Sequence, residues 1–166
     1  MLCCVVCSGV GSPPEAEYTE HSLIGYRWYD YNYVTPSYCF GHGLSFTTFT
    51  YTGLQTSSLS SPDVGQQVEV DVTNTGALMG SEVVQLYLTS PTSTATNGEA
   101  KRQLKRFVKL NNLAPGDTQR VSLSLSTRDL SVWDEATEDW QVVTGTYTVY
   151  VGTSSCDFRQ STTFEV

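Results

Sequence analysis

Hydrophobic and polar side chains alternate along the chain from about residue 64 onward. Apolar residues occupy every second position in four segments, at residues 68–72, 84–88, 121–125 and 147–151. Successive side chains of a β-strand point to opposite faces, so each segment predicts a strand with one buried face and one face towards water. We expect the inward residues to share one core, which includes Val70, Val72, Leu86, Leu123 and Val149.

Turn-forming residues separate the predicted strands. Asn74-Thr75-Gly76 follows the first segment, and Pro115-Gly116 precedes the third. Asparagine and glycine tolerate a positive φ, and proline presets φ for a turn. Short strands at this spacing, without a helical period, predict an all-β fold. The span 64–166 matches the roughly 100 residues of an immunoglobulin-like β-sandwich.

Tyr147 stands near the start of a late strand and closely follows Gly145. A tyrosine in this place can return its hydroxyl to backbone further upstream, which is the tyrosine corner of such sandwiches. We predict this structural role for Tyr147 in preference to a catalytic one.

Residues 20–49 show no such alternation. Aromatic side chains crowd residues 25–33, Gly41-His42-Gly43 forms a flexible break, and residues 44–51 predict the first strand of the sandwich. Because interfaces are enriched in Tyr, Trp and Arg, we interpret the aromatic cluster as an interdomain contact within an irregular lead-in. Stacking on carbohydrate is the alternative. The predicted contact residues are Tyr26, Arg27, Trp28, Tyr29 and Asp30.

Residues 133–140 place two tryptophans around four carboxylates. The indoles of Trp133 and Trp140 could stack on a sugar whose hydroxyls bond to the acids. We favour a hairpin in which the tryptophans cap the sandwich core and the acids solvate the turn, since buried tryptophan is common in these folds. Sugar binding by Trp133 and Trp140 is kept as the alternative.

The chain is acidic, with 17 Asp and Glu against 9 Lys and Arg and a formal net charge of −8. Nucleic-acid affinity comes mostly from cationic side chains on phosphates, so we expect no nucleic-acid partner. The basic run at residues 101–106 is interpreted as a solvated strand face. No run approaches the ~20 apolar residues of a transmembrane helix, so no membrane partner is expected.

The five cysteines are an odd number and cannot all pair within one chain. Cys4-x-x-Cys7 lacks a second ligand pair, so we expect no metal site and no cofactor. A disulfide between Cys39 and Cys156 is left open.

Residues 1–12 have no basic start and only a short apolar stretch, which argues against a signal peptide. His21 and His42 have no recognisable nucleophile beside them and are expected to be structural.

Several sequence motifs occur in an order that resembles the C-terminal part of glycoside hydrolase family 3, the family of β-glucosidases and β-xylosidases. The resemblance covers about residues 18–157. Its motifs are Gly25-Tyr26-Arg27-Trp28-Tyr29-Asp30, Phe40-Gly41-His42-Gly43-Leu44-Ser45-Phe46-Thr47-Thr48-Phe49, Val70-Asp71-Val72-Thr73-Asn74-Thr75-Gly76, Gly80-Ser81-Glu82-Val83-Val84-Gln85-Leu86-Tyr87, Gln103-Leu104-Lys105-Arg106-Phe107, Leu113-Ala114-Pro115-Gly116 and Gly152-Thr153-Ser154-Ser155. The chain departs from the family at Arg106, where Gly is usual, and at Cys39, where Pro is usual, so different local turns are expected.

The resemblance implies three segments. Residues 1–17 are unmatched and expected to be disordered, residues 18–50 correspond to the end of an α/β sandwich domain and a linker, and residues 51–166 form a fibronectin type III-like domain. The implied partners are the catalytic barrel and the α/β domain, with polysaccharide and self-association through the lead-in aromatics as further possibilities. An extracellular location is expected for the family, although the residues themselves leave location open.

The resemblance brings no catalytic residue to this chain. Retaining glycosidases flank the scissile bond with two carboxyl groups about 5–5.5 Å apart. In the family these groups belong to domains upstream of the matched part, so we expect a module that supports the catalytic domains and does not hydrolyse glycosides alone. A free-standing carbohydrate-binding, adhesion or structural sandwich is the alternative.

Overall fold

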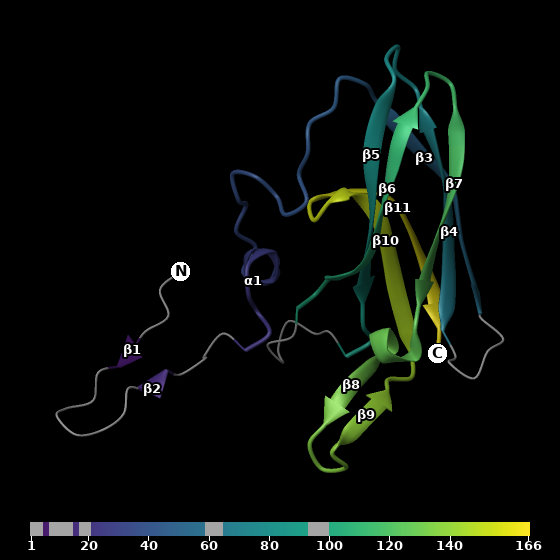
Figure 1. Ribbon diagram of the computed structural model, residues 1–166. Coiled ribbons are helices and arrows are strands. Elements are labelled where there is room, and N and C mark those ends of the chain that lie inside the picture. The colour runs from purple at the N-terminus through teal and green to yellow at the C-terminus, as the bar shows by residue number, and fades with distance from the viewer. Residues whose placement is uncertain (1–4, 7–14, 17–20, 59–64, 93–99) are drawn as a thin grey trace.

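The computed structural model describes residues 5–6, 15–16, 21–58, 65–92 and 100–166. Figure 1 shows a tall β-sandwich with a lead-in segment beside it. In chain order the elements are β1 (Val5–Val6), β2 (Glu15–Ala16), α1 (Tyr26–Tyr31), β3 (Phe49–Ser58), β4 (Gln66–Asn74), β5 (Gly80–Thr89), β6 (Gln103–Leu113), β7 (Thr118–Leu125), the 3₁₀ helix η1 (Thr127–Leu130), β8 (Ser131–Asp134), β9 (Asp139–Val142), β10 (Thr146–Ser154) and β11 (Asp157–Glu165).

Two antiparallel sheets form the sandwich. One has the strand order β3-β4-β7 and the other β11-β10-β5-β6, while β8 and β9 form a separate hairpin. The hairpin projects from one end of the sandwich, beside η1 (Figure 1). The prediction of an all-β, immunoglobulin-like sandwich is confirmed, because seven strands form the two packed sheets and all but two of the described elements are strands.

The core lies between the two sheets and contains the residues that the alternating pattern predicted. Val70, Val72, Leu86 and Val149 are fully buried and Leu123 is almost so, all in one cluster. The period-two pattern therefore identified the inward face of each sheet, and these core predictions are confirmed.

Strand β5 departs from the predicted alternation. Gln85 and Tyr87, which should face water, are 4 % and 0 % exposed. The Tyr87 hydroxyl donates to Oε1 of Gln85 (2.7 Å), and Nε2 of Gln85 donates to the carbonyl oxygens of Gly41 (3.1 Å) and Thr153 (2.5 Å). The outer face of β5 is buried because the lead-in lies against it. A strand covered on both faces cannot show a clean alternation.

The first strand of the sandwich begins later than predicted, at Phe49 instead of at residue 44. Its first ladder partner is Asn74, the last residue of β4, so the preceding residues have no strand to pair with. Leu44 and Phe46 are consequently 95 % and 97 % exposed in an irregular segment.

The lead-in contains one helical element that the sequence did not reveal. Helix α1 has six residues and begins after Gly25, whose φ is 61°. At the N-terminus, Val5–Val6 pairs antiparallel with Glu15–Ala16. The disorder expected for residues 1–17 stays a prediction. The rest of residues 1–20, including Cys4 and Cys7, lies outside the described residues.

The buried cluster predicts which truncations destabilise the sandwich. Leu86→Ala and Leu123→Ala should each lower the free energy of unfolding by about 2–5 kcal/mol, because each removes buried methyl groups and leaves a cavity. Leu78→Ala is the control, since Leu78 is mostly exposed and its loss should cost less than about 0.5 kcal/mol. Urea denaturation of the three variants measures this, and equal losses at all three sites would contradict the assigned core.

Candidate functional site

The lead-in is fixed to the sandwich by two residues of α1. The Tyr26 ring stacks on Phe40 with centroids 4.8 Å apart, and its hydroxyl accepts a hydrogen bond from the Leu104 amide (2.8 Å). The Asp30 carboxylate forms a bidentate ion pair with the Arg102 guanidinium, in which Nε donates to Oδ2 at 3.2 Å. These contacts join α1 to the start of β6.

A disulfide makes this attachment covalent. Cys39 is bonded to Cys156 in the β10–β11 turn, and next to it the Ser155 amide donates to the Phe40 carbonyl oxygen (2.9 Å). The pair closes a loop with a sequence separation of 117. In the chain-entropy model, a loop of that length stabilises the fold by roughly 4–5 kcal/mol through the unfolded state. The disulfide left open by the sequence is thus formed.

The structure places the five residues of the predicted interdomain contact in α1. Tyr26 and Asp30 contact the chain's own sandwich. Trp28 meets Tyr29 edge to face at 5.4 Å, and Tyr29 is exposed. An interdomain contact by Tyr26, Arg27, Trp28, Tyr29 and Asp30 stays a prediction.

Residues 103–106 of the basic run form the start of β6, as predicted, but Arg102 and Arg106 are ion-paired and only partly exposed. Arg106 donates to both carboxylate oxygens of Asp129 (3.2 and 2.5 Å), and the same carboxylate accepts the Ser126 amide hydrogen at the start of η1 (2.8 Å). The β5–β6 register shifts between Leu86 and Tyr87, next to Arg106. This irregularity lies where the chain departs from the family's usual glycine.

The hairpin β8–β9 carries the two predicted tryptophans as direct cross-strand partners, with ring centroids 5.6 Å apart. The hairpin is confirmed, but the tryptophans do not cap the core. Trp133 is 50 % and Trp140 37 % exposed, and neither belongs to the core cluster. The Arg128 guanidinium lies 3.3 Å from the centroid of the Trp140 ring and covers one of its faces.

The predicted tyrosine corner holds the base of this hairpin. The Tyr147 hydroxyl donates towards the carbonyl oxygens of Leu130 and Val143, each at 2.8 Å. Leu130 immediately precedes β8 and Val143 immediately follows β9. One buried hydroxyl therefore joins both ends of the hairpin, and the structural role predicted for Tyr147 is confirmed.

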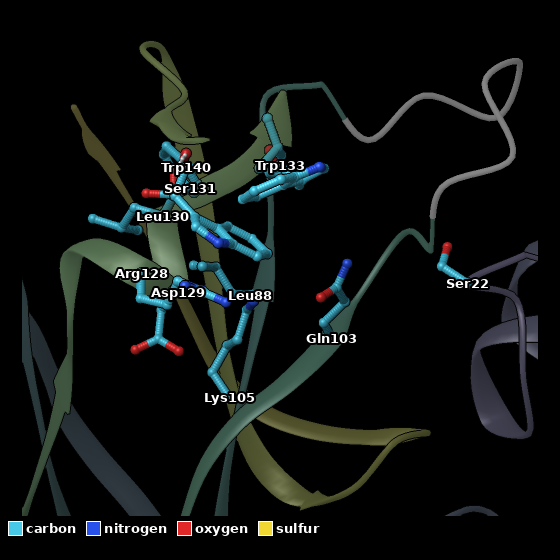
Figure 2. A pocket seen from close by; sticks show the side chains of 13 residues that line it. Ser22, Leu88, Gln103, Lys105, Arg128, Asp129, Leu130, Ser131, Trp133 and Trp140 are labelled. Carbon is cyan, nitrogen blue, oxygen red and sulfur yellow. Dashed lines mark hydrogen bonds between the residues drawn. The ribbon is translucent and has the colours of Figure 1, made fainter. Parts of the chain in front are cut away.

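A cleft of about 540 Å³ lies between the hairpin, η1 and β6. Figure 2 shows the indoles of Trp133 and Trp140 on one side of it and the side chains of Gln103, Lys105 and Arg128 around the rest. Its walls combine aromatic surface with a few polar groups, which is the usual make-up of a small-molecule site.

A second hollow, of about 390 Å³, holds the carboxyl groups of Glu82 and Asp157. The Tyr51 hydroxyl donates to Glu82 (3.0 Å), and Arg159 is paired with Asp157 (2.8 Å). Burial raises the pKa of Glu82 above its usual range, while the hydrogen bond from Tyr51 and the charge of Arg159 oppose that change. Glu82 carries no signal in the sequence that marks it as a site residue, because an isolated carboxylate in a strand belongs to no motif.

Two negative findings bear on other classes of site. Within the described ranges, no group of three or more His, Cys, Asp or Glu side chains is placed to hold a metal ion. The helices that the structure describes are too short and too polar to cross a bilayer.

Known proteins match both the sandwich and the lead-in. A family model for the fibronectin type III-like domain matches residues 82–155. Probable beta-glucosidase D of Aspergillus niger is 40% identical over 169 aligned residues, which cover 92% of this chain and 22% of that protein. A beta-D-glucoside glucohydrolase from Trichoderma reesei superposes with a TM-score of 0.85 at 34% identity, over 96% of this chain and 24% of that one. A beta-glucosidase from Streptomyces venezuelae, solved with D-glucose, gives 0.82 at 39% identity, over 90% and 19%.

The two-sheet fold, the tyrosine corner and the matched model define the protein class as a fibronectin type III-like module. The chain corresponds to the C-terminal part of the multidomain β-glucosidases of glycoside hydrolase family 3. It spans about 22% of the length of the curated relatives it matches. The family resemblance noted in the sequence is therefore confirmed.

The raised pKa of Glu82 predicts a specific pH dependence of stability. Glu82 has a higher pKa in the folded protein than in the unfolded chain, so at a pH between these two values the folded state binds more protons. The contribution of Glu82 to the free energy of unfolding therefore falls as pH rises through the folded pKa. Glu82→Gln keeps an oxygen that can accept the Tyr51 hydrogen bond and removes the titration. Compared with the wild type, the variant should therefore gain stability as pH rises from the ordinary pKa of a glutamate, about 4, through the raised folded pKa.

Urea denaturation at a series of pH values across that range measures the difference in free energy of unfolding between the wild type and Glu82→Gln. Glu135→Gln is the control, because Glu135 lies exposed in the hairpin turn and should follow the wild type. The free energy of unfolding of Glu82→Gln should exceed that of the wild type by more as pH rises. If this difference stays constant or shrinks as pH rises, burial does not disfavour the Glu82 carboxylate.

Proposed function

We propose that the chain is the accessory module that braces the catalytic domains of a family 3 β-glucosidase, and that it docks through its lead-in. The relatives are matched over the lead-in and the sandwich together, as the C-terminal portion of much longer enzymes. Hydrolysis of the glycosidic bond belongs, in this proposal, to the partner domains, and the chain supplies support.

The observation that carries the proposal is the exposure of hydrophobic side chains along the lead-in. Of the fifteen exposed large hydrophobic side chains among the described residues, eight lie in this short segment: Ile24, Tyr29, Tyr33, Val34, Tyr38, Phe40, Leu44 and Phe46. Large contiguous apolar surface is uncommon on monomeric proteins and marks interaction sites. A concentration of this kind on one side of a small sandwich supports a docking face.

The attachment of the lead-in to the sandwich makes this face suitable for docking. The Cys39–Cys156 disulfide and the Asp30–Arg102 ion pair hold the segment in place before any partner arrives. A surface that is already ordered loses less conformational entropy on association, which leaves more of the interaction energy for affinity. We propose that Arg27, Trp28 and Tyr29 take part in the same contact. Without the partner, this face would instead pair two copies of the chain.

Docking can be tested with the catalytic portion of a relative, such as that of Aspergillus niger beta-glucosidase D without the matched region. The tagged chain, co-expressed with that portion, should retain it through purification. The double variant Leu44→Glu/Phe46→Glu should weaken the complex at least about tenfold, since it places two charges in an apolar contact. The same variant should abolish concentration-dependent sedimentation of the chain alone.

Phe107→Glu is the matched control, because Phe107 is an exposed aromatic residue on β6 of the sandwich itself. It should leave both measurements unchanged. If Phe107→Glu disrupts the complex as strongly as the lead-in variant does, or if neither variant affects it, the lead-in is not the docking face.

A further inference from the structure

The exposed tryptophan pair has no role in closing the fold. The core cluster is complete without Trp133 and Trp140, and the hairpin base is held by the Tyr147 hydroxyl. Tryptophan presents a large apolar surface together with a polar N–H group, so two adjacent indoles at the surface are a strong binding element when they border a cavity. Here they border the cleft of about 540 Å³.

The two indoles differ in what they can offer a ligand. Arg128 covers one face of Trp140 at 3.3 Å and so fixes that ring as part of the cleft wall. Trp133 is the more exposed of the two, and no cation lies over its ring within the described part of the chain. Trp133 is therefore the ring with a face available for stacking.

The polar groups of the cleft also differ in their availability. Asp129 lines the cleft, but its carboxylate is engaged by Arg106 and by the Ser126 amide. In contrast, the Lys105 ammonium has no hydrogen bond or ion pair within the ranges that the structure describes. Burial lowers its pKa, and the charge of Asp129 opposes that change. A partly desolvated ammonium without a partner is costly, and oxygen acceptors on a ligand would relieve that cost.

The surroundings of the cleft restrict the charge of its ligand. The chain as a whole is acidic, and four carboxylates stand in the hairpin turn beside the tryptophans. A polyanion such as a nucleic acid would be repelled by them. A neutral ligand with one apolar ring face and several hydroxyl oxygens fits this cleft. The ring face can stack on an indole, and the hydroxyl oxygens can accept hydrogen bonds from the Lys105 ammonium and the Gln103 amide. A pyranose sugar has that combination.

We propose that this cleft is a binding site for a neutral β-linked oligosaccharide. One pyranose ring stacks on Trp133, and its hydroxyl oxygens accept hydrogen bonds from Lys105 and the Gln103 amide. The choice of a β-linked sugar as ligand rests on the proposed β-glucosidase role. The site itself lies mainly on the hairpin, η1 and β6; Ser22 of the lead-in lines it, but none of the eight exposed hydrophobic side chains of the docking face does. Sugar binding by the isolated chain is therefore independent of docking.

The test is a titration of the full chain with cellotriose, followed by calorimetry and by the tryptophan fluorescence. Saturable binding is expected. Trp133→Ala should weaken it about tenfold, the scale of one aromatic stacking contact, and Trp133→Phe should restore part of the loss. Lys105→Met should also weaken binding at least about tenfold, because it removes a charged hydrogen-bond donor. Lys109→Met, a change to an exposed lysine on the same strand, should bind as the wild type does.

Thermal unfolding of each variant, measured in parallel, shows whether a variant that binds more weakly is still folded. Lys105→Met tests the site even if Trp133→Ala disturbs the hairpin. The absence of saturable binding would overturn the proposal. Equal affinity in wild type, Trp133→Ala and Lys105→Met would overturn it as well. A fluorescence change that follows addition of the catalytic portion, but not of cellotriose, would assign the hairpin to docking. Failure of docking would appear in the Leu44→Glu/Phe46→Glu experiment, so the two failures are distinguishable.

Discussion

The arrangement of the whole chain depends on the burial of two polar side chains on the outer face of β5. Gln85 and Tyr87 bond to each other, and the remaining amide hydrogens of Gln85 reach carbonyl oxygens of Gly41 and Thr153. Buried polar groups are costly when unpaired, so this network is stable only while the lead-in supplies its carbonyl. The φ of Gly41 is 78°, and a β-carbon there would collide with the Gln85 amide. The lead-in thus completes the sandwich.

Both proposed surfaces follow from that constraint. Because the lead-in is attached to the sandwich, its hydrophobic side chains point outward from a fixed segment and can form a docking face. The same sheet positions the cleft: β6 carries Lys105 and pairs with β5, while Tyr147 at the start of β10 anchors the tryptophan hairpin. The proposed docking face lies on the lead-in, whereas the proposed sugar cleft lies mainly on the hairpin, η1 and β6, so the same sheet positions both.

The sequence predicted those parts of the structure that obey a simple period. Val70 and Leu123 follow the alternation of a strand with one buried face, and the turn residues mark where the strands end. Prediction was wrong at Tyr87, because burial of both faces removes the alternation, and α1 is too short to show a helical period. The sequence located Trp133 in a hairpin, but whether a hairpin folds over the core or projects beside a cleft depends on tertiary contacts such as the Tyr147 hydrogen bonds.

The central claim is that the lead-in is a structured part of the sandwich, and amide hydrogen exchange tests it directly. The Leu104 amide donates to the Tyr26 hydroxyl (2.8 Å) and the Ser155 amide to the Phe40 carbonyl (2.9 Å), so both report on the attachment. The account predicts that both exchange at least about a hundredfold more slowly than in an unstructured peptide. Exchange of both at the unprotected rate, while the Val149 amide in the core stays protected, would contradict it.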